Sequence, residues 1–198
     1  MRQVITSAAI QQEVRAGEGD LPALMVRYQG GEAVAIDELV RRLSPALLRF
    51  FWFSRRSTME AEDLLQDCWL RIHRSRHTYR PPEPVLPWIF AIARHTRLDG
   101  YRRSRRRSAR EVLVAEPPET APVEAEKGGD DGEAMRELLN RLPPPQREVI
   151  VMLKMSGMSL QEVARAISSS VGAVKQKAHR AYANLRRMLD EKRENKDA

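Results

Sequence analysis

The residues best suited to binding chemistry form an arginine-rich stretch, LPWIFAIARHTRLDGYRRSRRR, at positions 86–107. Its apolar residues recur at helical spacing, which predicts a helix with one face on a core. A second face interleaves aromatic and cationic side chains: Phe90, Arg94, Arg97, Tyr101 and Arg105. Guanidinium groups attract phosphates, and unstacked bases can lie on aromatic rings. A solvated basic helix end is the plainer alternative, but such a face usually mixes charges and only Asp99 interrupts this one, which favours nucleic-acid binding.

The charge of the whole chain also favours an anionic partner. The 198 residues carry a formal net charge of +7, and the pI is about 10.0, as in many nucleic-acid-binding proteins. Membrane phospholipid is the competing anion, yet no apolar run approaches the roughly 20 residues that span a bilayer. The N-terminal residues lack the long apolar region of a signal peptide. The single cysteine, Cys68, cannot form an internal disulfide, so we expect a cytoplasmic protein in which this thiol has no chemical role.

An acidic stretch rich in proline and glycine divides the chain. Its acidic residues are Glu116, Glu119, Glu124, Glu126, Asp130 and Asp131. Since it has little to bury, we expect residues 109–133 to be a disordered linker, acting either as a simple spacer or as an electrostatic mimic of nucleic acid. The linker would join a domain at 21–108 to a second at 134–190, with an N-terminal extension at 1–20 and a charged tail at 191–198.

Helical periodicity on both sides of the linker predicts an all-α fold of two small helical domains. In the first domain two helices are interrupted at Gly30-Gly31, and Pro45 is expected to begin the next. The run FFWF at residues 50–53 is too apolar for a surface helix. We expect most of it in the core, with a surplus that could dock a partner.

The next helix, in STMEAEDLLQDCWLRIHR, has two arrangements open to it. Either Leu65, Trp69 and Ile72 or Leu64, Cys68 and Ile72 can face the core. Both leave a largely acidic face, which by itself is an ordinary solvated surface. The loop that follows, Arg76 to Pro87, contains four prolines, and rigid loops beside a basic aromatic face are suitable places to bind a ligand.

The second domain shows the pattern of a helix-turn-helix. A helix over Gln146–Met155 is closed by Gly157, and Ser159 with Glu162 forms a capping box for a short helix. A three-serine turn leads to a longer basic helix from Val171. Its early exposed residues are of the types that bond base edges and phosphates: Lys175, Gln176, Lys177 and Arg180.

Both domains resemble one family, the bacterial RNA polymerase sigma factors of the extracytoplasmic-function (ECF) class. AEDLLQDCWLRIHR and PWIFAIARHTRLDGYRRSRRR resemble two helices of the family's region 2. LNRLPPPQREVIVM and LQEVARAISSSVGAVKQKAHRAYANLR are similar to region 4. The four motifs stand in the family's order and cover the chain from about Leu21 to Leu189, except for the linker.

The resemblance implies three binding surfaces, each named here by its residues. The polymerase face would dock on the coiled-coil clamp of core RNA polymerase's largest subunit: Asp63, Leu64, Gln66, Asp67 and Leu70. The −10 set would hold a flipped base and the edge of the melted promoter: His77, Tyr79, Arg80, His95, Asp99, Arg102 and Arg103. The −35 set would contact promoter DNA: Arg147, Arg165, Ser170, Lys175, Gln176, Lys177 and Arg180. His95 replaces the family's usual Asn and Lys177 a frequent Arg, so the bases preferred at these positions can differ.

The family also implies a role without covalent chemistry or cofactors. The chain would bind core polymerase, recognise the −35 and −10 promoter elements, promote DNA melting, and be restrained by an anti-sigma factor that is often membrane-bound. Two alternatives belong to other classes. A helix-turn-helix repressor would usually dimerise, but no heptad zipper is visible. A nucleic-acid-modifying enzyme would need a nucleophile motif, a phosphate-binding glycine loop or a metal site, and His73, His77, His95 and His179 lack a recognisable metal-site spacing.

Overall fold

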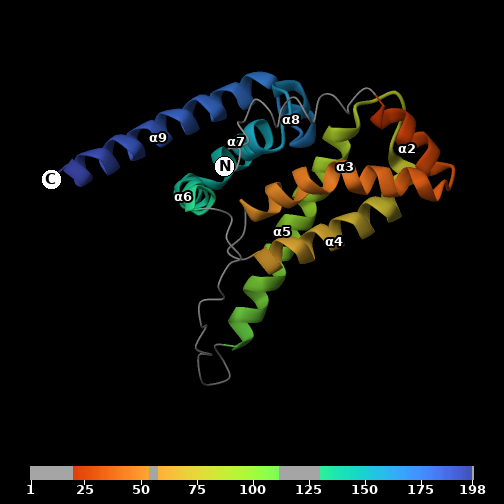
Figure 1. The fold of residues 1–198 in the computed structure, drawn as a ribbon, viewed down its shortest axis with the longest axis horizontal. Coiled ribbons are helices and arrows are strands. Elements are labelled where there is room, and N and C mark those ends of the chain that lie inside the picture. Colours follow the sequence, from red (N-terminus) through yellow and green to blue (C-terminus); the bar gives the residue numbers. More distant parts are fainter. Residues whose placement is uncertain (1–19, 54–57, 112–129, 198) are drawn as a thin grey trace, which may run out of the picture.

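The computed structural model describes residues 20–53, 58–111 and 130–197, and within these ranges every regular element is a helix (Figure 1). The first half contains α2 (Leu21–Gln29), α3 (Ala33–Trp52), α4 (Thr58–Ser75), η1 (Arg76–Thr78) and α5 (Val85–Glu111). The second half contains α6 (Asp130–Asn140), α7 (Pro144–Ile150), η2 (Val151–Met155), α8 (Leu160–Ala166) and α9 (Val171–Asp197). The all-α prediction is confirmed. The predicted N-terminal extension and most of the predicted linker lie outside the described residues, and helices occupy both ends of the linker range.

Local sequence explains where the first helices begin and end. The break between α2 and α3 falls at Gly30-Gly31, as predicted, and Gly31 has a φ of 88°, a conformation that favours glycine. The prediction that Pro45 begins a helix is wrong, because Pro45 lies inside α3. An internal proline costs a helix about 3 kcal/mol. Burial of Leu43 and Leu47 on either side of it offsets that cost.

Most of the apolar side chains of α4 and of the FFWF run lie in the core or against it. Leu64, Cys68 and Ile72 are the buried set of α4, which decides between the two arrangements left open by the sequence. All three phenylalanines of the FFWF run are buried. The surplus residue, Trp52, is covered by α6 of the second half, because the Arg136 guanidinium lies 5.6 Å from its ring centroid.

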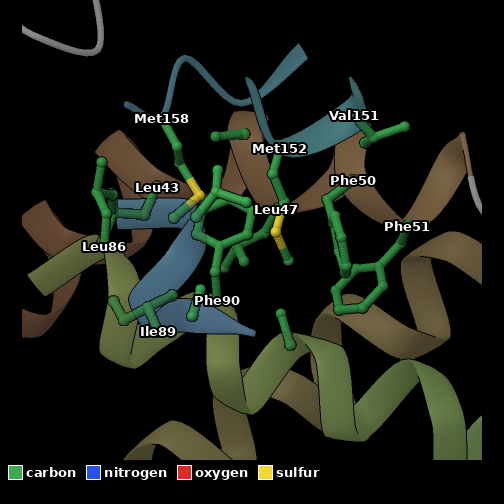
Figure 2. Packing of buried hydrophobic residues seen from close by; sticks show 14 of the residues in the cluster. Leu43, Leu47, Phe50, Phe51, Leu86, Ile89, Phe90, Val151, Met152 and Met158 are labelled. Atoms are coloured by element: carbon green, nitrogen blue, oxygen red, sulfur yellow. The ribbon is translucent and has the colours of Figure 1, made fainter. Parts of the chain in front are cut away.

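The two halves share one core instead of each enclosing its own. Buried residues of α3 and α5 pack against η2 and the start of the helix-turn-helix, and Figure 2 shows Met152 and Met158 beside Leu47 and Phe90. Phe90 is fully buried and meets Phe50 edge-on at 5.5 Å. Its ring is therefore unavailable to stack on a base, which corrects the prediction that Phe90 lies on a nucleic-acid face. Periodicity identified a second face of the helix, but the second half of the chain covers its early part, whereas Tyr101 further along is exposed.

None of the helices in the described ranges is both long enough and apolar enough to span a membrane.

Candidate polymerase and nucleic-acid interfaces

The loop between α4 and α5, residues 76–84, is called here the capture loop. It begins with η1 and is shorter than the sequence predicted, because α5 already starts at Val85. Tyr79 is buried, its ring lies 5.7 Å from that of Trp88, and its hydroxyl donates to the Glu83 carbonyl. Trp88 Nε1 donates to Thr78 Oγ1 at 3.2 Å. Tyr79 therefore holds the loop together, and the side chains of His77 and Arg80 are the exposed members of the −10 set here.

Four residues of the −10 set stand on α5, and three of them, His95, Asp99 and Arg102, have different surroundings. His95 is exposed, and its Nδ1 lies 2.8 Å from the Ala91 carbonyl, which can only accept, so Nδ1 carries a proton and donates to it. Asp99 accepts from Arg71 at 2.7 Å and pairs with Arg102 at 3.5 Å. The hydrogen bond from Arg71 keeps the pKa of the Asp99 carboxyl below its usual value. Asp99 thus ties α5 to α4, while much of the Arg102 side chain stays exposed.

The polymerase face lies on α4 next to the −10 set. Asp63 and Gln66 are exposed, and the apolar side chain of Leu70 beside them is 56% exposed. Asp67 forms an ion pair with Arg103 of the −10 set. Leu64 is only 5% exposed, so the structure separates it from the other members and puts it in the core.

The arginines near the middle of α5 do not face solvent freely. The side chain of Glu148, from α7, is only 8% exposed and accepts from the Arg97 guanidinium, while Arg94 Nε lies 3.2 Å from the same carboxylate oxygen. These pairs join the two halves of the chain. They also remove Arg94 and Arg97 from the predicted nucleic-acid face. Sequence reasoning missed Glu148, because a lone acid in a short helix carries no signal of an ion pair across 51 residues.

The predicted helix-turn-helix is present in α8, the serine turn and α9. Ser159 and Glu162 form the predicted capping box, with hydrogen bonds of 3.2 and 2.8 Å. Ser170 Oγ accepts from the Ala173 amide at 3.1 Å and so caps the start of α9. Val174 is fully buried, which fixes the rotation of α9. Lys175, Gln176 and Arg180 are exposed, Lys177 is half-buried, and Arg165 is exposed on α8.

Arg147 belongs to the −35 set but has internal partners. Its guanidinium donates to the side chain and carbonyl of Asn140, at 2.8 and 3.1 Å, and to the Leu142 carbonyl at 3.3 Å. Burial, and to a lesser extent the nearby Arg97 charge, lowers its pKa. These bonds hold the turn between α6 and α7, so the geometry favours a structural role over a phosphate contact.

The described residues contain no group of three or more His, Cys, Asp or Glu side chains arranged to hold a metal ion. The polymerase face, the −10 set and the −35 set consist of exposed cations, other hydrogen-bonding groups and one acidic face.

Comparisons with known proteins match two separate stretches of the chain to one family. The family model for sigma-70 region 2 matches residues 39–107, and the model for sigma-70 region 4 matches residues 132–185. The sigma factor CarQ of Myxococcus xanthus is 34% identical over 171 residues, which cover 84% of this chain and 96% of CarQ. The ECF sigma factor SigM of Mycobacterium tuberculosis is 32% identical over 168 residues, covering 84% of this chain and 83% of SigM.

Solved structures show the same fold. CnrH, in complex with the cytosolic domain of CnrY, matches with a TM-score of 0.69 and 26% identity, covering 86% of this chain and 97% of CnrH. RpoE of Bartonella quintana, in complex with the anti-sigma factor NepR, matches with a TM-score of 0.63 and 24% identity, over 78% of this chain and 96% of RpoE. With both sigma regions matched in order and relatives matched over most of their length, the chain belongs to the ECF sigma factors, non-enzymatic subunits that recognise promoters and initiate transcription with RNA polymerase.

Proposed function

We propose that this sigma factor divides its work among three surfaces. The exposed part of the polymerase face, Asp63, Gln66, Asp67 and Leu70, docks on core polymerase. The capture loop and the later half of α5 bind the −10 element and stabilise its melted form. The start of α9 reads the −35 element in the major groove. Leu64, Tyr79, Asp99 and Arg147 support these surfaces from within instead of contacting a partner.

The observation that carries the proposal is the arrangement at the start of α9. Lys175, Gln176 and Arg180 project from one exposed surface, while Val174 anchors the opposite side in the core. Lysine and arginine bind guanine edges and phosphates, and glutamine can bind adenine with two hydrogen bonds. A helix that is held rigidly on one side and carries such residues on the other suits insertion into a groove.

Base capture on the first half is supported by the exposed polar groups of the capture loop and by His95. Pulling a base out of the duplex costs a few kcal/mol, which contacts to the extruded base must offset. His77, Arg80 and His95 offer hydrogen-bond groups for such contacts, and Arg102 and Arg103 offer charge for the backbone. Melting then results from binding energy, without covalent chemistry.

A regulatory partner is part of the proposal. CnrH was solved with the cytosolic domain of CnrY, and by analogy we propose that an anti-sigma factor, soluble or membrane-bound, sequesters this chain. Because core polymerase and promoter DNA are its working partners, we place the chain in the cytoplasm.

The test compares two arginines of one helix. Arg180→Ala should lower affinity of the reconstituted holoenzyme for a promoter with its −35 element, whereas Arg186→Ala, also exposed but further along α9, should not. Core-polymerase affinity should be the same for both. If Arg180→Ala and Gln176→Ala both leave binding to a set of −35 variants unchanged, α9 does not read that element.

A further inference from the structure

The last residue of α2, Gln29, reaches across to the capture loop. Its side-chain amide Nε2 donates to the Arg76 carbonyl at 2.7 Å and to the Tyr79 carbonyl at 2.9 Å. Arg76 is the first residue of η1 and Tyr79 directly follows its end, so one NH₂ group holds both ends of that turn and uses both of its hydrogens. Among the described residues, no other side chain of α2 donates a hydrogen bond to the loop backbone.

The chain around Gln29 fixes the amide in place. Tyr28, immediately before it, is buried, and its hydroxyl lies 2.7 Å from His73 Nδ1 near the end of α4. The Arg76 guanidinium lies 5.9 Å from the centroid of the Tyr28 ring. The glycine pair that ends α2 lets the chain turn away directly after Gln29, since Gly31 has a positive φ. Gln29 therefore stands on a rigid support beside the loop.

The capture loop is thus held from two sides. Gln29 binds it on the α2 side, and Trp88 of α5 holds Thr78 and packs on Tyr79 on the other. The Thr78 hydroxyl is already occupied, since it also donates to the Ser75 carbonyl at 2.7 Å. His77 lies between these attachments and Arg80 directly follows them, and both residues are exposed.

We infer that Gln29 is a positioning residue for capture of a −10 base, an inference that rests on the proposed role of the capture loop. Gln29 touches no DNA itself. It orders the backbone between Arg76 and Tyr79 before DNA arrives, so that His77 and Arg80 meet an extruded base without a further ordering cost. Preorganisation of this kind increases the share of binding energy that remains to offset unstacking.

The experiment uses the full chain, reconstituted with core polymerase, and three variants. Gln29→Glu keeps the shape but presents oxygens to the two carbonyls, and Gln29→Ala removes the side chain. Val26→Ala is the matched control, because Val26 is exposed on the same helix and its side chain has no part in these bonds. Hydrogen exchange is measured over residues 76–84 of the free protein. Closed-complex affinity, and the rate of opening by permanganate footprinting, are measured on duplex promoters.

We expect both Gln29 variants to exchange faster over residues 76–84 and to open duplex promoters roughly tenfold more slowly than the control, because two hydrogen bonds to the loop backbone are lost. Affinity for core polymerase and closed-complex affinity should not change. Normal exchange in the loop, or a normal opening rate despite faster exchange, would overturn the inference. An equal loss of polymerase binding and opening would also overturn it, because it would indicate general destabilisation.

A separate variant distinguishes this inference from the proposed function. Replacing both His77 and Arg80 with alanine removes the exposed groups but leaves Gln29 and its two bonds intact. If this double variant opens duplex promoters normally, the capture loop does not hold a base and the proposed function fails there. If it is defective while the Gln29 variants open normally, only the positioning role of Gln29 is wrong.

Discussion

Replacing Glu148 with Gln should weaken the packing of the two halves of this sigma factor. The side chain of Glu148 is 8% exposed, and its partners Arg97 and Arg94 are 16% and 32% exposed. Removing one member of a buried ion pair typically costs 3–5 kcal/mol, because a buried charge loses its partner. Both guanidiniums here retain some access to water, so we expect a smaller loss of unfolding free energy, about 2–3 kcal/mol. For a chain of this length that corresponds to a melting temperature lower by about 4–12 °C.

A double-mutant cycle separates the ion pair from other effects of the substitution. Glu148→Gln, Arg97→Gln and the double variant are unfolded by heat and by urea, and the coupling energy between the two positions should be about 1–3 kcal/mol. Arg94→Gln should cost less than Arg97→Gln, because Arg94 is more exposed. Since the halves share one core, wild-type unfolding should follow a single transition. An unchanged melting temperature in Glu148→Gln, or a coupling energy near zero, would refute this reasoning.

Other predictions concern the surfaces and one buried thiol. Asp67→Arg should weaken core-polymerase binding in titrations without lowering the melting temperature by more than a few degrees, since exposed ion pairs contribute only about 0–1 kcal/mol. Gln176→Ala should change the preferred −35 bases in a promoter-library assay, each bidentate contact being worth roughly 1–3 kcal/mol, and Lys177→Ala should change them less because Lys177 is half-buried. Ser159→Ala removes the capping box of α8 and should lower the unfolding free energy by about 1 kcal/mol in urea titrations. Burial raises the pKa of the Cys68 thiol to about 12, so at pH 8 iodoacetamide should modify it only after the chain unfolds.

The sequence predicted those parts of the fold that depend on local chemistry. Glycines at the end of α2, the capping pair Ser159 and Glu162, and the serine turn act within a few residues, and the structure contains each of them. Pro45 failed as a helix start because burial on both sides of it outweighs its local preference. Local signals identified the elements well, but tertiary packing decided where α3 continued.

For the candidate sites, the sequence indicated which residues share a helix face, but not whether that face reaches solvent. The family resemblance put Leu64 with the acidic positions of α4, and helical spacing put Phe90 beside the arginines of α5, yet both are buried. Which side of a helix reaches solvent depends on what packs against it, and periodicity in one helix contains no information about a partner far along the chain. The support that Gln29 gives to the capture loop was hidden for the same reason, since it joins residues 47 and 50 positions apart.

The contacts of α5 indicate which part of this helix is available for nucleic acid. Its early residues, such as Ile89 and Phe90, contribute to the shared core, and Arg97 is held by Glu148. A phosphate could replace Glu148 on Arg97, whose side chain is 16% exposed, only if the two halves moved apart. Beyond Arg97 the helix is still tied to α4 through Asp99 and Arg71, while Tyr101, Arg102 and Arg103 are exposed. The far end of α5 projects past the other helices (Figure 1). In the packed arrangement, nucleic acid can therefore reach α5 through its later half and the adjacent face of His95, whereas a contact that replaces Glu148 on Arg97 requires separation of the two halves.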